Sequence, residues 1–110
     1  MFDLHWSTSE KKVARRVYDE ALNKALVVVM TEFKTKAAAV VIPSDMWAVE
    51  AYLQERRREI DEIFDYRYSR LPLVFANLIN RGLVDEAELA GLADDKLMQI
   101  QSILSAFRRR

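Results

Sequence analysis

The chain has 110 residues, with 17 basic side chains, 17 acidic side chains and no cysteine. This length fits one domain with a modest core, and the balanced charge provides no overall field to concentrate nucleic acid or an anionic membrane around the protein. The lack of cysteine excludes disulfides, thiolate nucleophiles and Cys-ligated metals. Two glycines, two prolines and 51% hydrophobic residues disfavour turn-rich all-β folds and predict an all-α protein.

The beginning of the chain does not resemble a targeting segment. The first twelve residues, MFDLHWSTSEKK, contain no basic region followed by an apolar run. Nowhere do about 18 apolar residues follow one another, which is the minimum for a membrane-spanning helix. We therefore expect a cytoplasmic protein that does not insert into membranes.

The first predicted helix runs from Thr8 to about Val41. Ser7 and Glu10 have the spacing of a capping box, and Trp6 is placed to act as a hydrophobic staple. The helix should end near Pro43, with Ser44 as the N-cap of the next helix. Its apolar stripe recurs in steps of three or four residues, at Leu22, Leu26, Val29, Phe33, Ala37 and Val40.

The second predicted helix, Asp45 to Ser69, combines a narrow apolar seam with heavily charged flanks. Between Leu53 and Ile60 the heptad position that should be apolar is Arg56. A seam interrupted by arginine is more typical of a subunit interface than of a monomer's interior. The apolar seam residues are Met46, Val49, Leu53, Ile60, Ile63 and Phe64.

The lengths of these two helices predict self-association. A helix of about 33 residues is roughly 50 Å long, whereas a compact domain of this size has a radius of gyration of roughly 13 Å. The chain cannot enclose such a helix by itself. An antiparallel helical hairpin with an apolar stripe left over needs a second copy to cover it, which predicts an elongated homodimer.

The remaining residues, 71–107, predict a compact helical head. Pro72 begins a helix that Gly82 ends with a left-handed C-cap. Asp85 and Glu88 repeat the capping-box spacing for a short helix that stops at Gly91, and the last helix starts at Asp94 or Asp95. Its stripe consists of Leu97, Ile100, Ile103, Leu104 and Phe107.

The sequence offers no catalytic, metal or cofactor site. The only histidine, His5, precedes the first helix, where we expect it to be solvated, and there is no glycine-rich loop for phosphate. Four carboxylates lie close together in the second helix, but the simpler interpretation is a solvated face that pairs with Arg58 and Arg67. These carboxylates are Glu59, Asp61, Glu62 and Asp65. We therefore predict that the protein is not an enzyme.

Nucleic-acid binding is a weaker hypothesis. Arg56 to Arg58 form a basic cluster, and residues 73–104 can be drawn as helix, turn, helix. However, the candidate recognition helix opens with Asp94 and Asp95, which would repel phosphate, and acidic residues flank the arginines. The aromatic residues of the second helix are more typical of helix packing or of anchors for a protein partner, so we expect no nucleic-acid partner.

The second half of the chain carries an ordered series of short motifs. Over Asp45 to Leu104 their order, without a gap, resembles the fluorescence recovery proteins of cyanobacterial photoprotection, whereas the preceding residues match only in being a long helix. The motifs are Asp45-Met46-Trp47, Leu53 with Arg57-Arg58-Glu59-Ile60-Asp61, Phe64-Asp65-Tyr66-Arg67, Val74-Phe75-Ala76-Asn77-Leu78, Gly82-Leu83-Val84, Glu88-Leu89 and Ala93-Asp94-Asp95-Lys96.

This resemblance implies a fold and a function. Proteins of this family look like elongated helical homodimers with a compact head on each subunit, so residues 1–110 would form one such domain, with the dimerisation part at 8–70 and the head at 71–107. They bind the C-terminal domain of the photoactivated orange carotenoid protein, speed its return to the resting orange form and promote its detachment from the phycobilisome. The regulator itself would need no cofactor, since the carotenoid belongs to the partner.

The resemblance also implies site residues. The family's functional tryptophan and arginine correspond to Trp47 and Arg57, with Trp47 either a partner anchor or part of the dimer core. We expect the partner-binding or dimer-interface residues to be Trp47, Glu50, Arg56, Arg57, Asp61, Phe64 and Tyr68, and the partner contacts of the head surface to be Leu73, Phe75 and Gln99.

Several positions depart from the family pattern. Glu50 and Ala51 stand where the family has His-Asp, Leu73 replaces an exposed aromatic residue and Gln99 replaces a lysine. Losing one member of an interfacial ion pair weakens binding when the other member remains. A divergent member is therefore expected, and the alternative function is a dimeric helical adaptor of the same fold with a different protein partner.

Overall fold

The computed structural model describes residues 5–109 and is helical, which confirms the predicted all-α class; over these residues it contains no strand. Four α-helices and one short 3-10 helix, η1, follow one another along the chain. Their bounds are α1 Thr8–Ala38, α2 Asp45–Ile63, α3 Leu71–Asn80, η1 Glu86–Leu89 and α4 Asp94–Arg108.

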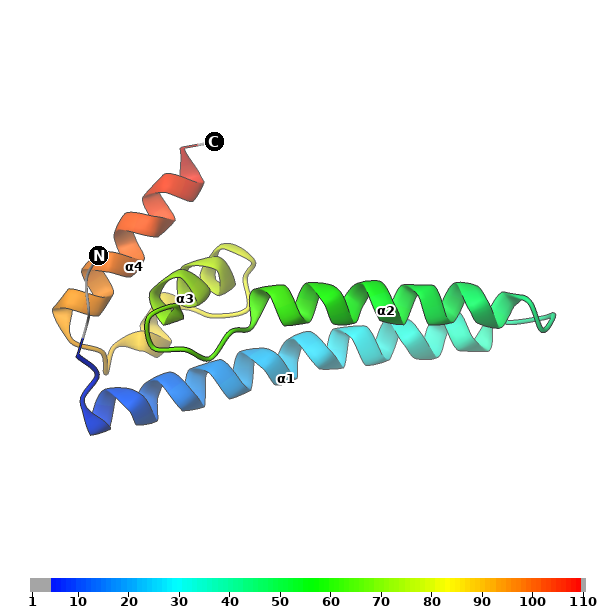
Figure 1. The fold of residues 1–110 in the computed structure, drawn as a ribbon, viewed down its shortest axis with the longest axis horizontal. Coiled ribbons are helices and arrows are strands. Elements are labelled where there is room, and N and C mark those ends of the chain that lie inside the picture. Colours follow the sequence, from blue (N-terminus) through cyan, green and yellow to red (C-terminus); the bar gives the residue numbers. More distant parts are fainter. Residues whose placement is uncertain (1–4, 110) are drawn as a thin grey trace.

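The molecule is elongated because α1 is longer than the rest of the chain can cover. The second half of α1 and α2 lie side by side and run in opposite directions, and we call this part the arm (Figure 1). Helices α3, η1 and α4 gather beside the first half of α1, and we call them the head. The extents are 55 × 32 × 23 Å and the radius of gyration is 17.1 Å, well above the roughly 13 Å of a compact domain of this size.

The start of α1 forms as the sequence predicts, with one exception. The backbone N–H of Ser7 donates to Glu10 Oε1 at 3.0 Å, and that of Glu10 donates to Ser7 Oγ at 3.2 Å, which confirms the capping box. Trp6 does not form the expected staple, because the first-turn position it would cover is Lys11. Its buried ring instead packs against Tyr68, 5.6 Å between centroids.

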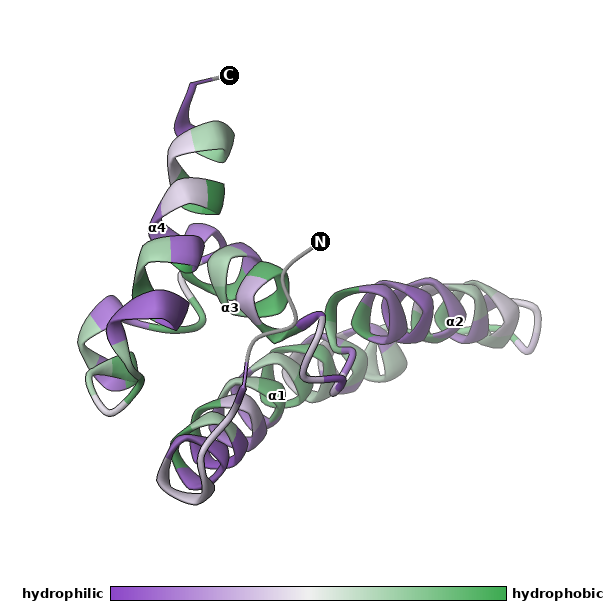
Figure 2. Ribbon diagram, turned by 60° about the vertical axis from the view of Figure 1, so that its left-hand side comes forward, coloured by the Kyte–Doolittle hydropathy of each residue, from purple (hydrophilic) through white to green (hydrophobic). Residues whose placement is uncertain are grey.

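The core lies between the head and the first half of α1. Buried residues of α1 recur at intervals of up to four positions and join one core with the apolar residues of α3, η1 and α4. Of these three elements, α1 packs chiefly on α3 and η1. The stripe predicted farther along α1 does not join this core; Leu22 only borders it, and Leu26 is exposed. Figure 2 shows hydrophobic residues along α3 and also in both helices of the arm. The largest fully buried side chains are Val17, Leu71, Phe75, Leu78, Leu89 and Leu104.

The predicted extent of the second helix is wrong at its C-terminal end. Instead of reaching Ser69, α2 ends at Ile63, and Phe64 is extended with φ −102° and ψ 99°. An extended chain places alternate side chains on one side, so Phe64 and Tyr66 both reach the ring of Tyr18, at 5.4 and 4.8 Å between centroids. Aromatic packing on α1 therefore prevails over continuation of the helix.

The turn between α1 and α2, residues 39–44, also differs from expectation. Helix α1 ends at Ala38, and Ser44 makes no side-chain cap. The side chain of Asp45 instead holds the turn that precedes it. Asp45 Oδ2 accepts hydrogen bonds from the backbone N–H groups of Val41 and Ile42 at 3.0 and 3.2 Å. These bonds lower the pKa of Asp45. We call this turn the tip.

The head follows the sequence signals closely. Pro72 lies in the first turn of α3, and Gly82, with φ +78°, ends it in the left-handed conformation. The N–H groups of Leu83 and Val84 then both donate to the carbonyl of Leu78. Asp85 and Glu88 form the predicted capping box at η1, and α4 begins at Asp94.

Candidate functional site

The arm exposes many large apolar side chains. Every residue of α2 is at least partly exposed to solvent. Large apolar side chains are exposed on both helices and at the tip, and such contiguous exposure marks an interaction surface. They are Leu26, Val27, Val28, Met30, Val41, Ile42, Met46, Trp47 and Leu53.

Four predicted site residues lie on one face of α2. Trp47, Glu50, Arg57 and Asp61 are spaced by 3, 7 and 4 positions, which keeps them on one side of a helix. All four are exposed, Trp47 to 64%. The half-buried positions of α2 alternate with them and are Asp45, Val49, Tyr52, Arg56, Glu59, Ile60 and Ile63.

An open groove of about 460 Å³ runs between α1 and α2. Its floor is apolar, and Arg56, Arg57 and Asp61 provide its charged lining. An apolar floor with a few charged groups is suited to a protein side chain rather than to a reacting substrate. The apolar residues are Leu22, Leu26, Val29, Leu53 and Ile60.

Arg56 and Arg57 have different surroundings. Arg56 is half-buried and pairs within its own helix, at 2.9 Å to Glu59 and 3.5 Å to Glu55, with its guanidinium 5.6 Å from the ring centre of Tyr52. Arg56 is therefore partly covered within its own chain, and the subunit interface expected at the interrupted seam stays a prediction. Met46 and Leu53 of that seam remain exposed.

Phe64 and Tyr68 lie apart from this face, at the head end of the molecule. Phe64 is half-buried against Tyr18. Tyr68 packs on Trp6, and Lys11 Nζ lies 5.2 Å from its ring centre. From Trp47 to the end of α2 at Ile63 the helix rises about 24 Å. The structure thus separates the predicted interface residues into an arm set and a head-end set.

One predicted head-surface residue is wrong. Phe75 has 0% exposure, because α3 turns its positions 71, 74, 75 and 78 toward the core and Phe75 points away from the exposed side chain of Leu73. Phe75 therefore cannot contact a partner on the folded head. Leu73 is exposed and Gln99 is half-buried.

Sequence reasoning missed a buried ion pair that joins α1 to α4. Lys96 Nζ lies 3.1 Å from Glu10 Oε1, and both residues are buried. Burial alone would raise the pKa of Glu10, but hydrogen bonds from the N–H groups of Ser7 and Ala93 and from Lys96 lower it from 4.5 to about 2. The partners are 86 positions apart, so no local pattern could indicate the pair.

Apart from the buried Glu10–Lys96 pair, most ion pairs of the described chain lie at its surface. Across residues 5–109 no three His, Asp or Glu side chains converge as a metal site, and His5 is exposed. Asp65 pairs with Arg67 as predicted, which lowers the pKa of this carboxylate, whereas Glu59 pairs with Arg56 rather than with Arg58. Within the same residues, no helix is both long enough and apolar enough to cross a bilayer.

Comparison with known proteins extends over the arm and the head alike. Residues 6–104 match the family described as photoprotection regulator fluorescence recovery protein. The fluorescence recovery protein of Synechocystis sp. PCC 6803 is 32% identical over 98 residues, which are 89% of this chain and 90% of that protein. The match includes α1, where the sequence alone indicated only a long helix.

Solved structures agree with this match. The fluorescence recovery protein of Fremyella diplosiphon superposes with a TM-score of 0.82 at 34% identity, covering 90% of this chain and 97% of that one. The Synechocystis structure gives a TM-score of 0.83 at 31% identity, covering 92% and 99%. The chain therefore belongs to the fluorescence recovery protein family of photoprotection regulators.

Proposed function

We propose that this protein binds the photoactivated orange carotenoid protein through that partner's C-terminal domain, accelerates its return to the orange form and promotes its detachment from the phycobilisome. The observation that carries this proposal is the family match, which runs through arm and head from residue 6 to residue 104. The work would be non-enzymatic and cytoplasmic, and residues 1–110 would act as one unit without a cofactor of its own.

The proposed working form is an elongated homodimer joined through the arms, within residues 8–70. Exposed apolar side chains on α2 and on the second half of α1, together with the groove between them, support this proposal. A second copy would remove this surface from water at roughly 25 cal/mol per Å² of apolar area. The heads, residues 71–107, would then project from the dimer and remain available.

The exposed face of α2 supports a role in partner recognition. Trp47 offers a large apolar ring to an interface, and Arg57 provides a planar fork of donors that matches a carboxylate. Glu50 and Asp61 give this face acidic groups that favour a partner with complementary cations. On the head we propose Leu73 and Gln99 as further partner contacts. Phe75 is no longer proposed, because it is buried.

A binding protein accelerates a conformational change only by binding the transition state more tightly than the starting state. Trp47 and the head-end set are about 24 Å apart along α2. Such a spread suits a partner whose two domains must approach one another, because both domains can be contacted at once. Equal affinity for the open and the closing form would leave the rate unchanged.

The test is the dark reversion of photoactivated orange carotenoid protein, followed by visible absorbance with and without this protein. Acceleration is expected, and Trp47→Ala should reduce it by about tenfold or more, as for an interface anchor. Met98→Ala, at an exposed position of α4, is the matched control. Unchanged reversion at saturating wild-type protein, with helicity intact, would contradict the proposal.

The departures at Glu50, Ala51, Leu73 and Gln99 favour one second candidate, a helical adaptor of the same fold with another protein partner. It predicts unchanged reversion together with retained self-association. A protein that neither accelerates reversion nor self-associates would contradict the adaptor as well.

A further inference from the structure

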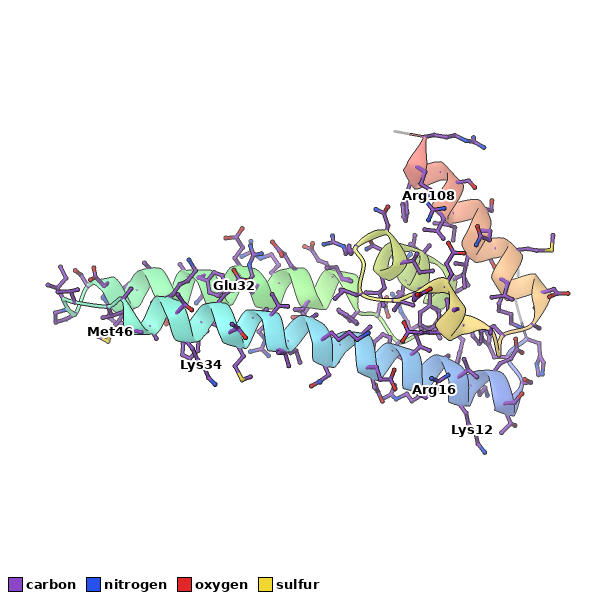
Figure 3. The ribbon with its side chains drawn as sticks, turned by 180° about the vertical axis from the view of Figure 1, so that it is seen from behind. Lys12, Arg16, Glu32, Lys34, Met46 and Arg108 are labelled. Carbon is purple, nitrogen blue, oxygen red and sulfur yellow. The ribbon has the colours of Figure 1, made fainter. Side chains whose placement is uncertain are left out.

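The first turns of α1 carry a concentration of positive charge that the chain as a whole does not have. Four basic side chains are exposed there, although the chain balances 17 basic against 17 acidic side chains. Because successive residues of a helix are about 100° apart, the four positions form one continuous sector of about 140°. Figure 3 shows Lys12 and Arg16 at the end of α1 that lies beside the head. The four residues are Lys11, Lys12, Arg15 and Arg16.

The segment between α2 and α3 extends this sector with two more cations. Lys11 Nζ lies 5.2 Å from the ring centre of Tyr68. The guanidinium of Arg15 lies 4.3 Å from the ring centre of Tyr66, so residues 65–70 lie beside the first turns of α1. Both arginines of this segment are exposed. The six cations, which we call the basic face, are Lys11, Lys12, Arg15, Arg16, Arg67 and Arg70.

Carboxylates of the same chain neutralise only part of the basic face. Arg15 pairs with Asp19 at 3.4 Å, and the two arginines of residues 65–70 both pair with Asp65. Across residues 5–109 no carboxylate, including that of Glu20 in the next turn of α1, forms an ion pair with the other three cations. These cations, which are available to an anion from outside the chain, are Lys11, Lys12 and Arg16.

The hydrogen bonds already present at the basic face indicate the anion that it accepts. Arg67 donates from Nε to Asp65 Oδ1 at 2.8 Å and from Nη2 to Asp65 Oδ2 at 2.5 Å. This is the bidentate geometry in which a guanidinium matches a carboxylate. Arg16 presents the same group to solvent, and the two lysines add point charges that accept an anion from several directions. The face is therefore suited to a run of carboxylates.

The aromatic rings beside the basic face are not free to stack on bases. Tyr66 packs edge to face on Tyr18 and on Tyr68, at 4.8 and 5.6 Å between centroids, and Arg15 lies over its ring. Tyr68 in turn packs on Trp6. Proteins that bind single-stranded nucleic acids combine basic groups with ring faces on which the bases stack. With these rings engaged, the face offers charge and hydrogen-bond donors, which match acidic side chains better than bases.

We propose that the basic face binds an acidic segment of a protein partner. None of its six cations belongs to the residues proposed to contact the carotenoid protein, so the inference goes beyond the proposed function. Trp47 lies in the first turn of α2, beside the tip, whereas the basic face lies at the head end. A partner held at the basic face leaves Trp47 free, and two docking surfaces on one molecule raise its effective concentration at an assembly that offers both ligands.

The probe is a short oligoglutamate peptide with a fluorescent label, titrated with the full chain and followed by fluorescence anisotropy. Binding is expected, and added salt should weaken it, because ions screen exposed charges. Lys12→Gln/Arg16→Gln removes two exposed cations of the face and should weaken binding by about fivefold, the effect of losing two surface ion pairs. The matched control, Lys24→Gln/Lys34→Gln, removes the same charge from exposed positions of α1 outside the face and should bind as the wild type does.

Three results would overturn the proposal: no binding by the wild type, equal weakening in the two double variants, or tighter binding of another anion. The last is tested with duplex DNA and with phosphatidylglycerol vesicles at equal charge concentration, and it would indicate a nucleic acid or a lipid surface. Dark reversion of the carotenoid protein should be unchanged by Lys12→Gln/Arg16→Gln. Slower reversion would assign the face to that partner instead, whereas a wild type that binds oligoglutamate but does not accelerate reversion would contradict the proposed function alone.

Discussion

Glu10 and Lys96 are buried charged residues, and each has hydrogen-bond and ion-pair partners within the described chain. The carboxylate of Glu10 caps α1 through Ser7, accepts from Ala93 N–H at 2.9 Å and pairs with Lys96. The ammonium of Lys96 also donates to the carbonyl of His5 and pairs with Asp95 at 3.3 Å. This network joins the beginning of the chain to the last helix.

Removing the Glu10 charge should destabilise the protein strongly. Glu10→Gln leaves the buried ammonium of Lys96 with only the more exposed Asp95 as a counter-charge, and we expect the free energy of unfolding to fall by about 3 kcal/mol. The double variant Glu10→Gln/Lys96→Met should lose less than the sum of the single changes. Urea unfolding at pH 7 measures all of them; additive losses would contradict the coupling.

The same pair determines how stability depends on acid. The pKa of Glu10 is about 2 in the folded protein against an ordinary 4.5, so its contribution is present above pH 4.5 and is lost as the pH falls toward 2. Wild-type protein should lose stability across this window more steeply than Glu10→Gln. Equal slopes in urea titrations at pH 5, 4 and 3 would rule this out.

Single residues also indicate what the sequence can predict. The capping boxes at Ser7 and Asp85 are local patterns, and both form as expected. The Glu10–Lys96 pair and the burial of Phe75 depend on which elements pack together. Spacing along one helix identifies its apolar face, but it does not indicate whether a neighbouring chain segment or solvent covers a given position.

At the scale of elements, the two glycines test the head in different ways. An added Cβ at Gly82 meets nothing within 4 Å, but φ there is +78°, so Gly82→Ala should cost about 1 kcal/mol through backbone strain. A Cβ at Gly91 would lie 2.6 Å from Val13 Cγ2, so Gly91→Ala should cost about 2 kcal/mol by overpacking the turn after η1 on α1.

Val13→Ala provides the control for this comparison. Added to Gly91→Ala, it should recover part of the lost stability, because it removes the clashing methyl groups; added to Gly82→Ala, it should recover none. Thermal unfolding of Gly82→Ala, of Gly91→Ala and of each combined with Val13→Ala measures these changes in stability. Rescue of both glycine variants would show that Val13 acts generally and that the close approach is unimportant.

The tip gives a second prediction for an element. Asp45→Ala removes the acceptor for the N–H groups of Val41 and Ile42, and their hydrogen exchange should become faster by roughly fivefold, the effect of losing a modest hydrogen bond. Amides in the middle of α1 should be unaffected. Unchanged exchange at the tip would mean that the turn is held by other contacts.

Some helix boundaries have causes that are local in the sequence, and others depend on residues far away in the chain. Gly82 and Pro72 fix the ends of α3 by backbone geometry alone, and the sequence identifies both. The end of α2 at Ile63 depends on Phe64 and Tyr66 reaching Tyr18, some 46 positions earlier in the chain. No periodicity near Phe64 contains that information, so the helix was expected to continue.

For the whole molecule, the position of the core decides which parts are stable alone. The head and the first half of α1 share one set of buried side chains, whereas α2 has none of its own. An isolated helix of 19 residues is marginal in water without tertiary packing. The arm should therefore gain its order from self-association, and its hydrogen exchange should become faster on dilution while that of the head does not.

Leu53→Asp makes this division measurable. Leu53 is exposed beside the groove of the arm, so a carboxylate there would lose water in the proposed dimer, and its desolvation would oppose association. We expect the dissociation constant to rise by at least about a hundredfold by sedimentation. The aromatic contacts of Trp6, Tyr18 and Tyr68 lie in the head half, so the near-ultraviolet circular dichroism should persist in the monomer. A variant that loses this signal together with the dimer would mean that the head, too, depends on the second copy.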